Sequence, residues 1–376
     1  MRVLCIFGTR PEAVKMAPVV KQLRRHPDRI TTRVWVTAQH REMLDQVLQL
    51  FNIEPDLDLD LMRNGQTPSQ VAGLVLQRLE PHLMQERPDW VVVQGDTTTA
   101  MATAIAAHHL QIGVAHVEAG LRTHDKRNPF PEEMNRIVVD AISDLHLAPT
   151  DKARLNLLRE GIPEASIRVT GNTVIDALLD VAGRPWVPPA GSPLASLAST
   201  GESNPRLILV TAHRRESFGQ PMRDICVAMR EIADKRGDQV RILFPVHLNP
   251  NVQEPVYQIL GNLGNVTLLP PLDYQSMVYL MKRSYLVLTD SGGLQEEAPS
   301  LGKPVLVLRE TTERPEAVEA GTARVVGTNP DQIVSATMKL LDDNIAYSQM
   351  AHAVNPFGDG HAAERIVAAL METRPA

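Results

Sequence analysis

Aromatic residues and cysteines are scarce in this chain. Phenylalanine, tryptophan and tyrosine make up only 4% of its 376 residues, so aliphatic side chains must build the core, and no row of aromatic rings is available to stack the bases of single-stranded nucleic acid. The two cysteines, Cys5 in a predicted buried strand and Cys226 in a predicted helix, provide neither a disulfide framework nor a zinc site. We therefore expect a cytoplasmic protein.

A long apolar run and an excess of positive charge are also missing. No segment approaches the length of a membrane span, and the N-terminal apolar stretch runs directly into Gly8-Thr9-Arg10, unlike a signal peptide. The net charge of −6 argues against broad binding to nucleic acids or anionic membranes. We expect neither a nucleic acid nor a membrane as a partner.

Metal-ligand spacing is a third absence. Asp56, Asp58 and Asp60 alternate with leucines, which is typical of an extended edge segment rather than of a metal-binding loop. No other group of histidine, cysteine and aspartate residues has the spacing of metal ligands. We predict no metal and no cofactor.

Strand-like apolar runs alternate with helical stretches along the whole chain. This alternation predicts an α/β fold with parallel sheets covered by helices. Eleven such runs are too many for one doubly wound sheet, so we predict two Rossmann-like domains that face each other across a cleft. The runs are RVLCIF, TRVWVTA, WVVVQGD, VAHVEAG, LHLAPT, RLILVTAH, RILFPVH, VTLLPP, YLVLTDS, PVLVLRE and ARVVG.

We place the domain boundary near Arg168–Gly171. Residues 1–170 then form the N-terminal domain, residues 171–359 the C-terminal domain, and a C-terminal helix within 360–376 returns to the first domain. The stretch 187–205, rich in proline, serine and glycine, is interpreted as a surface excursion. Since ligands of open α/β sheets bind outside the carboxyl ends of the strands, polar motifs at strand ends are the candidate site residues.

The most informative of these motifs is the turn Ser291-Gly292-Gly293, which lies between a predicted buried strand and a predicted helix. Two glycines let the backbone approach an anion, and the helix directs unpaired N–H groups at it. The turn therefore suits a diphosphate, and Glu296 or Glu297, one helical turn later, could hold ribose hydroxyls. An ordinary βαβ turn with exposed acids is the alternative reading.

A second turn, Gly8-Thr9-Arg10-Pro11-Glu12, follows the first predicted strand. Proline suits the first turn of a helix, and Arg10 and Lys15 would then stand near the positive end of that helix. The arrangement favours a phosphate or a diphosphate leaving group. A capped helix with solvated charges is the alternative.

Three acids stand at strand ends or in the loops that follow them: Asp96, Glu118 and Glu132. Singly, Asp96 could cap a helix, and Glu132 or its neighbour Glu133 could complement a helix dipole. Glu118 follows an apolar strand and should be paired, protonated or catalytic, because an unpaired buried charge is costly. Three carboxyls in one cleft would separate in pKa and take acid and base roles.

Histidine and arginine candidates lie in the second half of the chain. His213 ends the first strand there and could protonate or hydrogen-bond a leaving phosphate, while His247 ends the next strand and is the weaker candidate. Both could instead be structural. Arg314 and Glu316 stand near a predicted helix start, where the arginine could reach a phosphate and the glutamate a sugar hydroxyl.

Taken together, these motifs resemble the non-hydrolysing UDP-N-acetylglucosamine 2-epimerases of bacteria. The match covers nearly the full chain in one order, and that family has the two-domain fold of the glycosyltransferase-B type, with UDP held mainly by the C-terminal half. The matching segments are FGTRPEAVKMAP, TAQHREMLDQVL, GDTTTA, HVEAGLRT, FPEEMNR, TGNTVIDALL, TAHRRESFG, PVHLNPNVQEPV, TDSGGLQEEAPSLGKPVLV, TTERPEAVEAGTARVVGT and NPFGDG.

The resemblance implies a reaction and a set of roles. UDP-GlcNAc and UDP-ManNAc would interconvert by elimination of UDP with the C2 proton, which gives 2-acetamidoglucal, followed by re-addition. It also implies a homodimer that supplies ManNAc for surface polysaccharides, and it leaves Glu296 on a solvated helix face. The implied catalytic residues are Asp96, Glu118, Glu132 and His213, and the implied contacts to UDP or sugar are Arg10, Lys15, Arg136, Ser291, Gly292, Gly293, Glu297 and Arg314.

Two departures from the family pattern concern the uracil end of the ligand. Leu272 stands where some members have a polar residue, and Met277 replaces a frequent phenylalanine, so we expect altered uracil packing and retained activity. Gln39 and His40 fall where some members bind a second UDP-GlcNAc as an activator, which would regulate domain closure.

Three rival functions stay open at this point. A glycosyltransferase on the same fold would share the UDP pocket but would need an acceptor groove. A nucleotide-sugar sensor would keep the binding residues without needing the acids. A hydrolysing epimerase would release free ManNAc.

Overall fold

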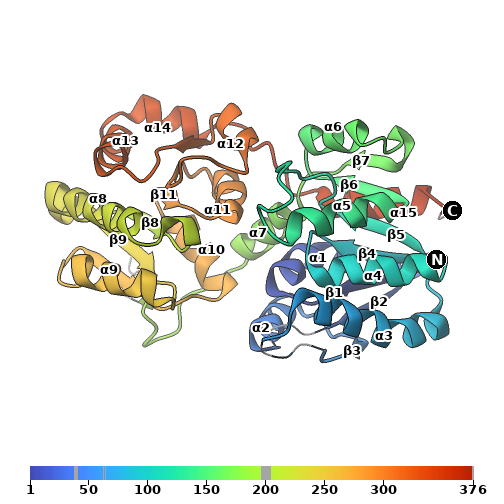
Figure 1. Ribbon diagram of the computed structural model, residues 1–376. Helices are drawn as coiled ribbons and strands as arrows, with labels where there is room; N and C mark the ends of the chain where they lie inside the picture. The colour runs from blue at the N-terminus through green and yellow to red at the C-terminus, as the bar shows by residue number, and fades with distance from the viewer. Residues whose placement is uncertain (38–40, 62, 64, 196–204, 375–376) are drawn as a thin grey trace. The chain divides into compact units, whose positions relative to one another are not determined.

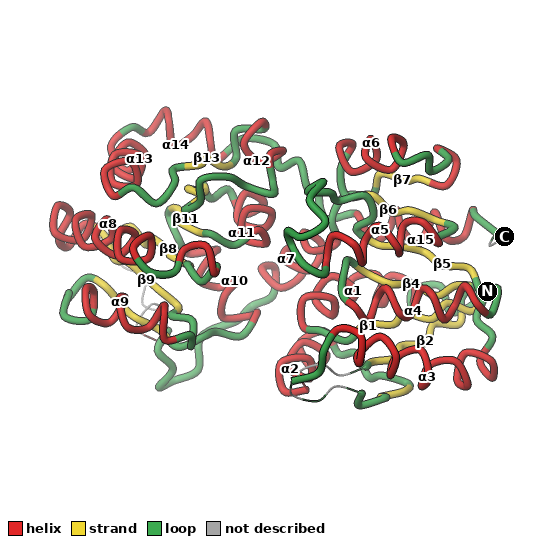
Figure 2. The backbone as a smooth tube through the Cα atoms, viewed as in Figure 1, coloured by secondary structure: helices red, strands yellow, loops and turns green. Residues whose placement is uncertain are grey.

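The computed structural model describes residues 1–37, 41–61, 63, 65–195 and 205–374, with residues 41 and 42 described by their backbone alone. The chain forms two compact units (Figure 1, Figure 2): unit 1 comprises Met1–Ala177 and Phe357–Ala376, and unit 2 comprises Leu178–Pro356. Each contains one parallel sheet with helices, which confirms the predicted α/β class with two Rossmann-like domains. The division falls within α7 (Thr173–Gly183), after the Arg168–Gly171 segment interpreted above as the hinge.

The sheet of unit 1 has seven parallel strands in the order β3-β2-β1-β4-β5-β6-β7. Strands β4 and β5 are buried along their whole length, and such strands appear in a sequence as continuous apolar runs. The predicted extended segment around Asp58 is the edge strand β3. The strands are β1 (Arg2–Phe7), β2 (Thr31–Val36), β3 (Leu57–Asp58), β4 (Trp90–Gln94), β5 (Gly113–Val117), β6 (Leu145–Ala148) and β7 (Ile167–Val169).

Helices pack on this sheet and enclose an aliphatic core. Helices α3, α4 and α5 lie side by side, and α15 packs against α1 (Figure 1). The core between the sheet and α3 and α4 includes Leu4, Val91, Val114 and Leu79, all fully buried. No helix that the structure describes is long and apolar enough to cross a membrane. The helices of unit 1, besides α7, are α1 (Arg10–Leu23), α2 (Arg41–Phe51), α3 (Pro68–Glu86), α4 (Thr98–His109), α5 (Glu132–Ile142), α6 (Asp151–Arg159) and α15 (Ala362–Glu372).

Unit 2 has the same architecture with six parallel strands in the order β10-β9-β8-β11-β12-β13. Its core includes Ile208, Met229, Phe244 and Leu288, all fully buried. Its strands are β8 (Arg206–Thr211), β9 (Val240–Pro245), β10 (Val266–Leu269), β11 (Leu286–Thr289), β12 (Val305–Val307) and β13 (Ala323–Val325), and its helices are α8 (Gln220–Arg236), α9 (Pro250–Leu260), α10 (Tyr274–Arg283), α11 (Gly292–Glu297), α12 (Pro315–Glu319), α13 (Pro330–Asp342) and α14 (Asn344–Ala351).

The strand order determines where polar side chains gather. In unit 1 the chain proceeds outward from β1 to β3 and then returns to place β4 beside β1, and in unit 2 it proceeds from β8 to β10 and returns to place β11 beside β8. Ligands of doubly wound sheets bind at the carboxyl ends of the strands where the order reverses in this way. The segments after β1, β4, β8 and β11 therefore supply candidate site residues, and the segments after the neighbouring strands β5 and β12 add Glu118, Glu132 and Arg314.

Candidate active site

The turn after β1 is organised by one buried glutamate. Glu12 Oε2 accepts hydrogen bonds from the N–H groups of Gly8, 3.1 Å, and Thr9, 2.8 Å, and Oε1 accepts one from Thr97 Oγ1, 2.7 Å. Burial raises the pKa of Glu12, and these hydrogen bonds oppose that rise. Because Thr97 is the N-cap of α4, Glu12 joins the ends of β1 and β4. The Thr9–Glu12 spacing of a capping box was the signal in the sequence.

The two cations predicted after β1 have different surroundings. Arg10, half-buried at the start of α1, makes no hydrogen bond or ion pair with any described residue, so its guanidinium stays available at the positive end of the helix. Lys15 Nζ instead lies 2.5 Å from Glu118 Oε2, with side-chain exposures of 17% and 8%. Of the paired, protonated or catalytic states expected for Glu118, the structure shows the paired one. The catalytic role of Glu118 and the role of Lys15 as a UDP contact stay predictions.

Glu118 occupies an unusual backbone position directly after β5. Its φ is +69°, in the left-handed region that few non-glycine residues adopt, and such residues concentrate at functional sites. Gln94 Nε2 at the end of β4 donates to the same Oε2 at 3.1 Å. Glu118 is therefore held in place by a lysine from α1 and an amide from the neighbouring strand.

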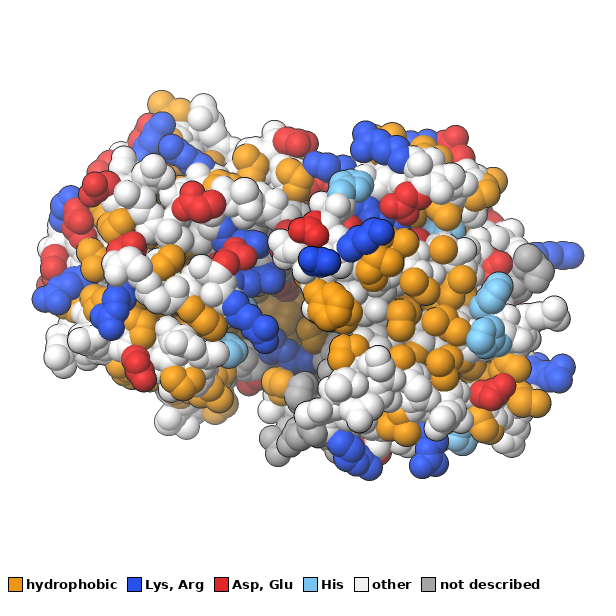
Figure 3. All heavy atoms as spheres, viewed as in Figure 1, with side chains coloured by type: hydrophobic (Ala, Val, Ile, Leu, Met, Phe, Trp, Pro, Cys, Tyr) orange, Lys and Arg blue, Asp and Glu red, His pale blue; other side chains and the backbone are white. Residues whose placement is uncertain are grey.

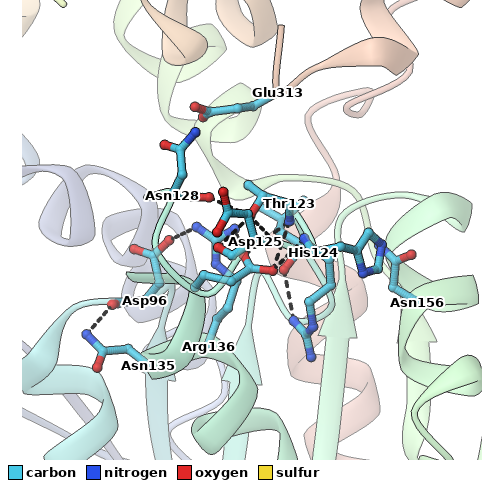
Figure 4. A network of polar contacts seen from close by, with 12 residues as sticks. Asp96, Thr123, His124, Asp125, Asn128, Asn135, Arg136, Asn156 and Glu313 are labelled. Atoms are coloured by element: carbon cyan, nitrogen blue, oxygen red, sulfur yellow. Dashed lines mark hydrogen bonds and ion pairs between the residues drawn. The ribbon is translucent and has the colours of Figure 1, made fainter. Parts of the chain in front are cut away.

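Asp96 is held from α5 (Figure 4). Arg136 Nη2 pairs with Asp96 Oδ2, and the Asn135 side-chain amide donates to the Asp96 backbone carbonyl at 2.9 Å. The N-cap of α4 is Thr97, whose Oγ1 accepts from Ala100 N at 3.0 Å, so the alternative role of Asp96 as that cap is wrong. Arg136, predicted as a substrate contact, is thus also the partner of a predicted catalytic acid.

The neighbours Glu132 and Glu133 both lie in the first turn of α5 but have different surroundings. Glu133 is 1% exposed, accepts from the N–H groups of Thr123 and His124 at 2.9–3.1 Å, and pairs with Arg136 Nη1 at 3.2 Å. Glu132 is half-buried and makes no hydrogen bond or ion pair with a described residue. Glu133 is therefore engaged in holding the loop, and the catalytic role of Glu132 stays a prediction.

In unit 2, a fully buried aspartate holds two loops together. Asp290, directly after β11, accepts at Oδ2 from the backbone N–H groups of His213, 2.6 Å, and Arg214, 2.7 Å. These bonds fix the loop that follows β8 against the turn that follows β11. Our reading of the sequence passed over Asp290, although a charged residue directly after a fully buried strand was a signal.

Two guanidinium groups lie beside the predicted anion turn. A Cβ built on Gly292 would lie 3.6 Å from Arg314 Cζ and 3.9 Å from Arg214 Nη2. Arg214 Nε and Arg309 Nη1 are buried without a hydrogen-bond partner among the described residues. Burial would raise the pKa of Glu313, but the charges of Arg214, Arg309 and Arg314 lower it. The environment of the turn is therefore strongly positive and suited to an anion.

His213 lies at the edge of this positive region. Its Nδ1 is 3.3 Å from Asp290 Oδ1, and its ring stacks on His247 with centroids 5.6 Å apart. Burial lowers the pKa of His213, and the charges of Arg214 and His247 lower it further against the opposing charge of Asp290. His213 is thus neutral at neutral pH and would gain a proton more readily beside a bound anion.

The expectation that Glu296 lies on a solvated helix face is wrong. Glu296 is 1% exposed, and its Oε1 pairs with Arg314 Nε. A buried carboxylate needs such a partner, and here the pair directs the arginine to the glycine turn. Glu297 is 8% exposed and accepts a hydrogen bond from Tyr274 Oη at 2.8 Å. Gln39 and His40 lie outside the described residues.

The chain is similar to one family of proteins over nearly its whole length. Residues 21–371 match the family model described as UDP-N-acetylglucosamine 2-epimerase. The UDP-N-acetylglucosamine 2-epimerase of Yersinia pestis is 54% identical over 371 residues, 98% of each chain. That of Escherichia coli K12 is 52% identical over 377 residues, 100% of this chain and 99% of the other. The crystal structure of the Neisseria meningitidis UDP-GlcNAc 2-epimerase bound to UDP-GlcNAc has a TM-score of 0.90 at 45% identity and covers 99% of this chain and 100% of that one.

Replacing Glu296 tests the buried ion pair of unit 2. We expect Glu296→Ala to lower the free energy of unfolding by ~3 kcal/mol, because Arg314 keeps its charge and loses its buried partner. Urea unfolding followed by circular dichroism measures the loss. The matched control is Glu231→Ala, which removes an exposed ion pair with Lys235 and should cost below ~0.5 kcal/mol. Equal losses would mean that Glu296 is solvated after all.

Proposed function

Because the chain belongs to the UDP-N-acetylglucosamine 2-epimerase family, we propose that it inverts C2 of UDP-GlcNAc to give UDP-ManNAc by eliminating UDP and adding it back. The observation that carries this mechanism is the positive glycine turn of unit 2, where Arg214 and Arg314 lie beside Gly292. Such a turn suits a diphosphate that must leave and return, while separate acids in unit 1 exchange the proton.

The leaving group requires the strongest electrostatic help. The C2–H bond of the sugar is weakly acidic, so elimination depends on making departure of the UDP oxyanion easy. We assign the diphosphate to Ser291, Gly292, Gly293 and Arg314, with His213 and Arg214 beside it. Glu297, oriented by Tyr274, holds the ribose hydroxyls, and Met277 of α10 provides a soft apolar surface for uracil next to Leu272. Arg10 is a further contact, from unit 1.

Proton exchange is assigned to three acids of unit 1. In the elimination, a base takes the C2 proton, the C2–H electron pair forms the C1=C2 double bond, and the C1–O pair leaves with UDP. Re-addition reverses these steps with a proton delivered to the other face of C2, so two groups are needed. Glu118 is paired with Lys15 and Asp96 with Arg136, while Glu132 has no cationic partner among the described residues, and we assign the second proton to it.

We also propose that the enzyme acts in the cytoplasm as a homodimer and supplies ManNAc units for surface polysaccharides. In support of self-association, Met134 on α5 is 37% exposed, and Ile137 and Val138 on α5 and Met101 and Ile105 on α4 are half-buried. Figure 3 shows hydrophobic side chains gathered over these helices. In support of the cytoplasm, both cysteines are buried and unpaired.

Incubation with UDP-GlcNAc as the only substrate in D2O tests the function. We expect UDP-ManNAc with deuterium at C2, seen by NMR and mass spectrometry, because the proton removed exchanges with solvent before re-addition. A reaction that starts only with a sugar acceptor would indicate a glycosyltransferase. Free ManNAc with one equivalent of UDP would indicate a hydrolysing enzyme, and binding without turnover would indicate a sensor.

The acids are tested by substitutions that keep their shape. Asp96→Asn, Glu118→Gln and Glu132→Gln should each lower kcat by ~10²-fold or more, because each removes a group that moves or stabilises the proton. Circular dichroism checks the fold, and Glu164→Gln, at a 69% exposed side chain, is the control with unchanged kcat. If a substitution lowers kcat only mildly, the acid that it replaces is not catalytic.

The pH dependence of UDP binding tests His213. The free protein has a lowered His213 pKa, and a neighbouring diphosphate would raise it, so binding takes up a proton between the two values. Affinity should therefore rise as the pH falls from roughly 7.5 to 6, more steeply in the wild type than in His213→Gln. Titration calorimetry measures both slopes. UDP itself titrates equally in both proteins, so equal slopes would separate His213 from the diphosphate.

A further inference from the structure

Two buried residues of unit 1, His116 and Asp140, have no part in the chemistry assigned above. His116 lies in β5 and Asp140 in α5, with exposures of 0% and 1%. His116 Nδ1 lies 2.6 Å from Asp140 Oδ1, and Nε2 lies 2.8 Å from the carbonyl oxygen of Gly95. Because a carbonyl oxygen only accepts hydrogen bonds, Nε2 carries a proton. One histidine therefore links Asp140 to the residue that directly precedes Asp96.

The second oxygen of Asp140 reaches the segment that carries Glu118. Oδ2 accepts from Gly120 N at 3.1 Å and from Arg122 Nη2 at 2.7 Å. Burial would raise the pKa of Asp140, but the charge and hydrogen bond of His116 and the charge of Arg122 lower it, so Asp140 is a carboxylate. Gly120 has φ of +85°, and a Cβ there would lie 2.3 Å from the Ala153 carbonyl oxygen, so only glycine fits this position.

Asp140 also anchors the helix on which Glu132 stands. His146, paired with His116 in the register of β5 and β6, donates from Nε2 to the Asp140 carbonyl at 2.8 Å. Two histidines on adjacent strands thus hold the C-terminal half of α5. Glu132 is the first residue of the same helix. A helix is stiff over this length, so a displacement at Asp140 moves Glu132 and Arg136 with it.

We propose that His116 and Asp140 form a positioning pair for epimerisation: they hold α5 and the ends of β4 and β5 together, so that Asp96, Glu118 and Glu132 keep one mutual geometry. This rests on the roles proposed above for the three acids. The pair touches none of them. It acts through the Gly95 carbonyl, the Gly120 N–H and helix α5.

The test compares two substitutions of Asp140. In Asp140→Asn the amide oxygen still accepts from Gly120, and the amide NH2 can donate to His116 Nδ1 in the tautomer that keeps its proton on Nε2, so kcat should stay within ~5-fold of wild type. Asp140→Ala removes the side-chain links to His116, Gly120 and Arg122 and keeps only the backbone link to His146. We expect kcat to fall by ~10²-fold, the usual effect of displacing catalytic groups by about 1 Å. KM and the dissociation constant of UDP should stay within ~3-fold, because neither variant alters unit 2.

A matched control separates positioning from stability. Asp144 joins the exit of α5 to the start of β5, since its Oδ2 accepts from Val114 N at 2.8 Å and its own N–H donates to the Val114 carbonyl at 2.9 Å. That link lies at the end of β5 away from Glu118. Asp144→Ala should lower the unfolding midpoint, by less than Asp140→Ala because it removes one hydrogen bond rather than three contacts, while kcat stays within ~2-fold.

The outcomes are distinct. If Asp140→Ala and Asp144→Ala have the same kcat, His116 and Asp140 are only structural and the inference is overturned. If the wild type forms no UDP-ManNAc, the proposed function fails instead. Should Asp140→Ala not fold, His116→Gln decides: its amide reaches the Gly95 carbonyl but not Asp140. There we expect a ~10-fold lower kcat at unchanged KM, and an unchanged kcat overturns the inference.

Discussion

Helix α5 is the element on which the arrangement of polar groups in unit 1 depends. Charged side chains can be buried only where opposite charges or hydrogen-bond donors meet them. The inward face of α5 meets this requirement at three points in two loops: Glu133 holds Thr123 and His124 and Asp140 holds Gly120 in the loop after β5, while Arg136 holds Asp96 in the loop after β4. A helix packed on a sheet thus gives the loops at the strand ends a rigidity that loops lack by themselves.

Unit 2 uses the same principle with fewer parts. Buried Asp290 binds the backbone after β8, and buried Glu296 orients Arg314. Asp290 Oδ2 accepts from two backbone N–H groups and Glu296 pairs with Arg314, and Arg214 beside Gly292 forms no ion pair with a carboxylate of the described residues. An anion that enters this region meets donors already in place, which lowers the reorganisation needed on binding. The buried carboxylates of Asp290 and Glu296 therefore hold the loop and the arginine that make the surroundings of Gly292 positive.

Much of the fold could be predicted because buried parallel strands are continuous apolar runs. Strand β7 was missed because it is a three-residue edge strand in which only Ile167 is buried, so no run marks it. The pairing of side chains could not be predicted from the sequence, for a different reason. Lys15 and Glu118 are joined across 103 positions, and nothing local in either motif indicates the other. The same holds for Glu296, whose burial is decided by Arg314 from the following loop.

The neighbours Glu132 and Glu133 show what distinguishes an acid that organises from one that reacts. Both are glutamates in the first turn of α5, and the periodicity of the helix does not indicate which of them is catalytic. Glu133 accepts from two backbone N–H groups and an arginine, so its lone pairs are occupied and it has little capacity to take a proton from a ligand. Asp140 is occupied in the same way, by Gly120 N–H, Arg122 and His116. Asp96 at 30% exposure and half-buried Glu132 keep lone pairs toward solvent. The number of occupied lone pairs, rather than the residue type or its position in a motif, therefore separates the carboxylates that build this protein from those available for its reaction.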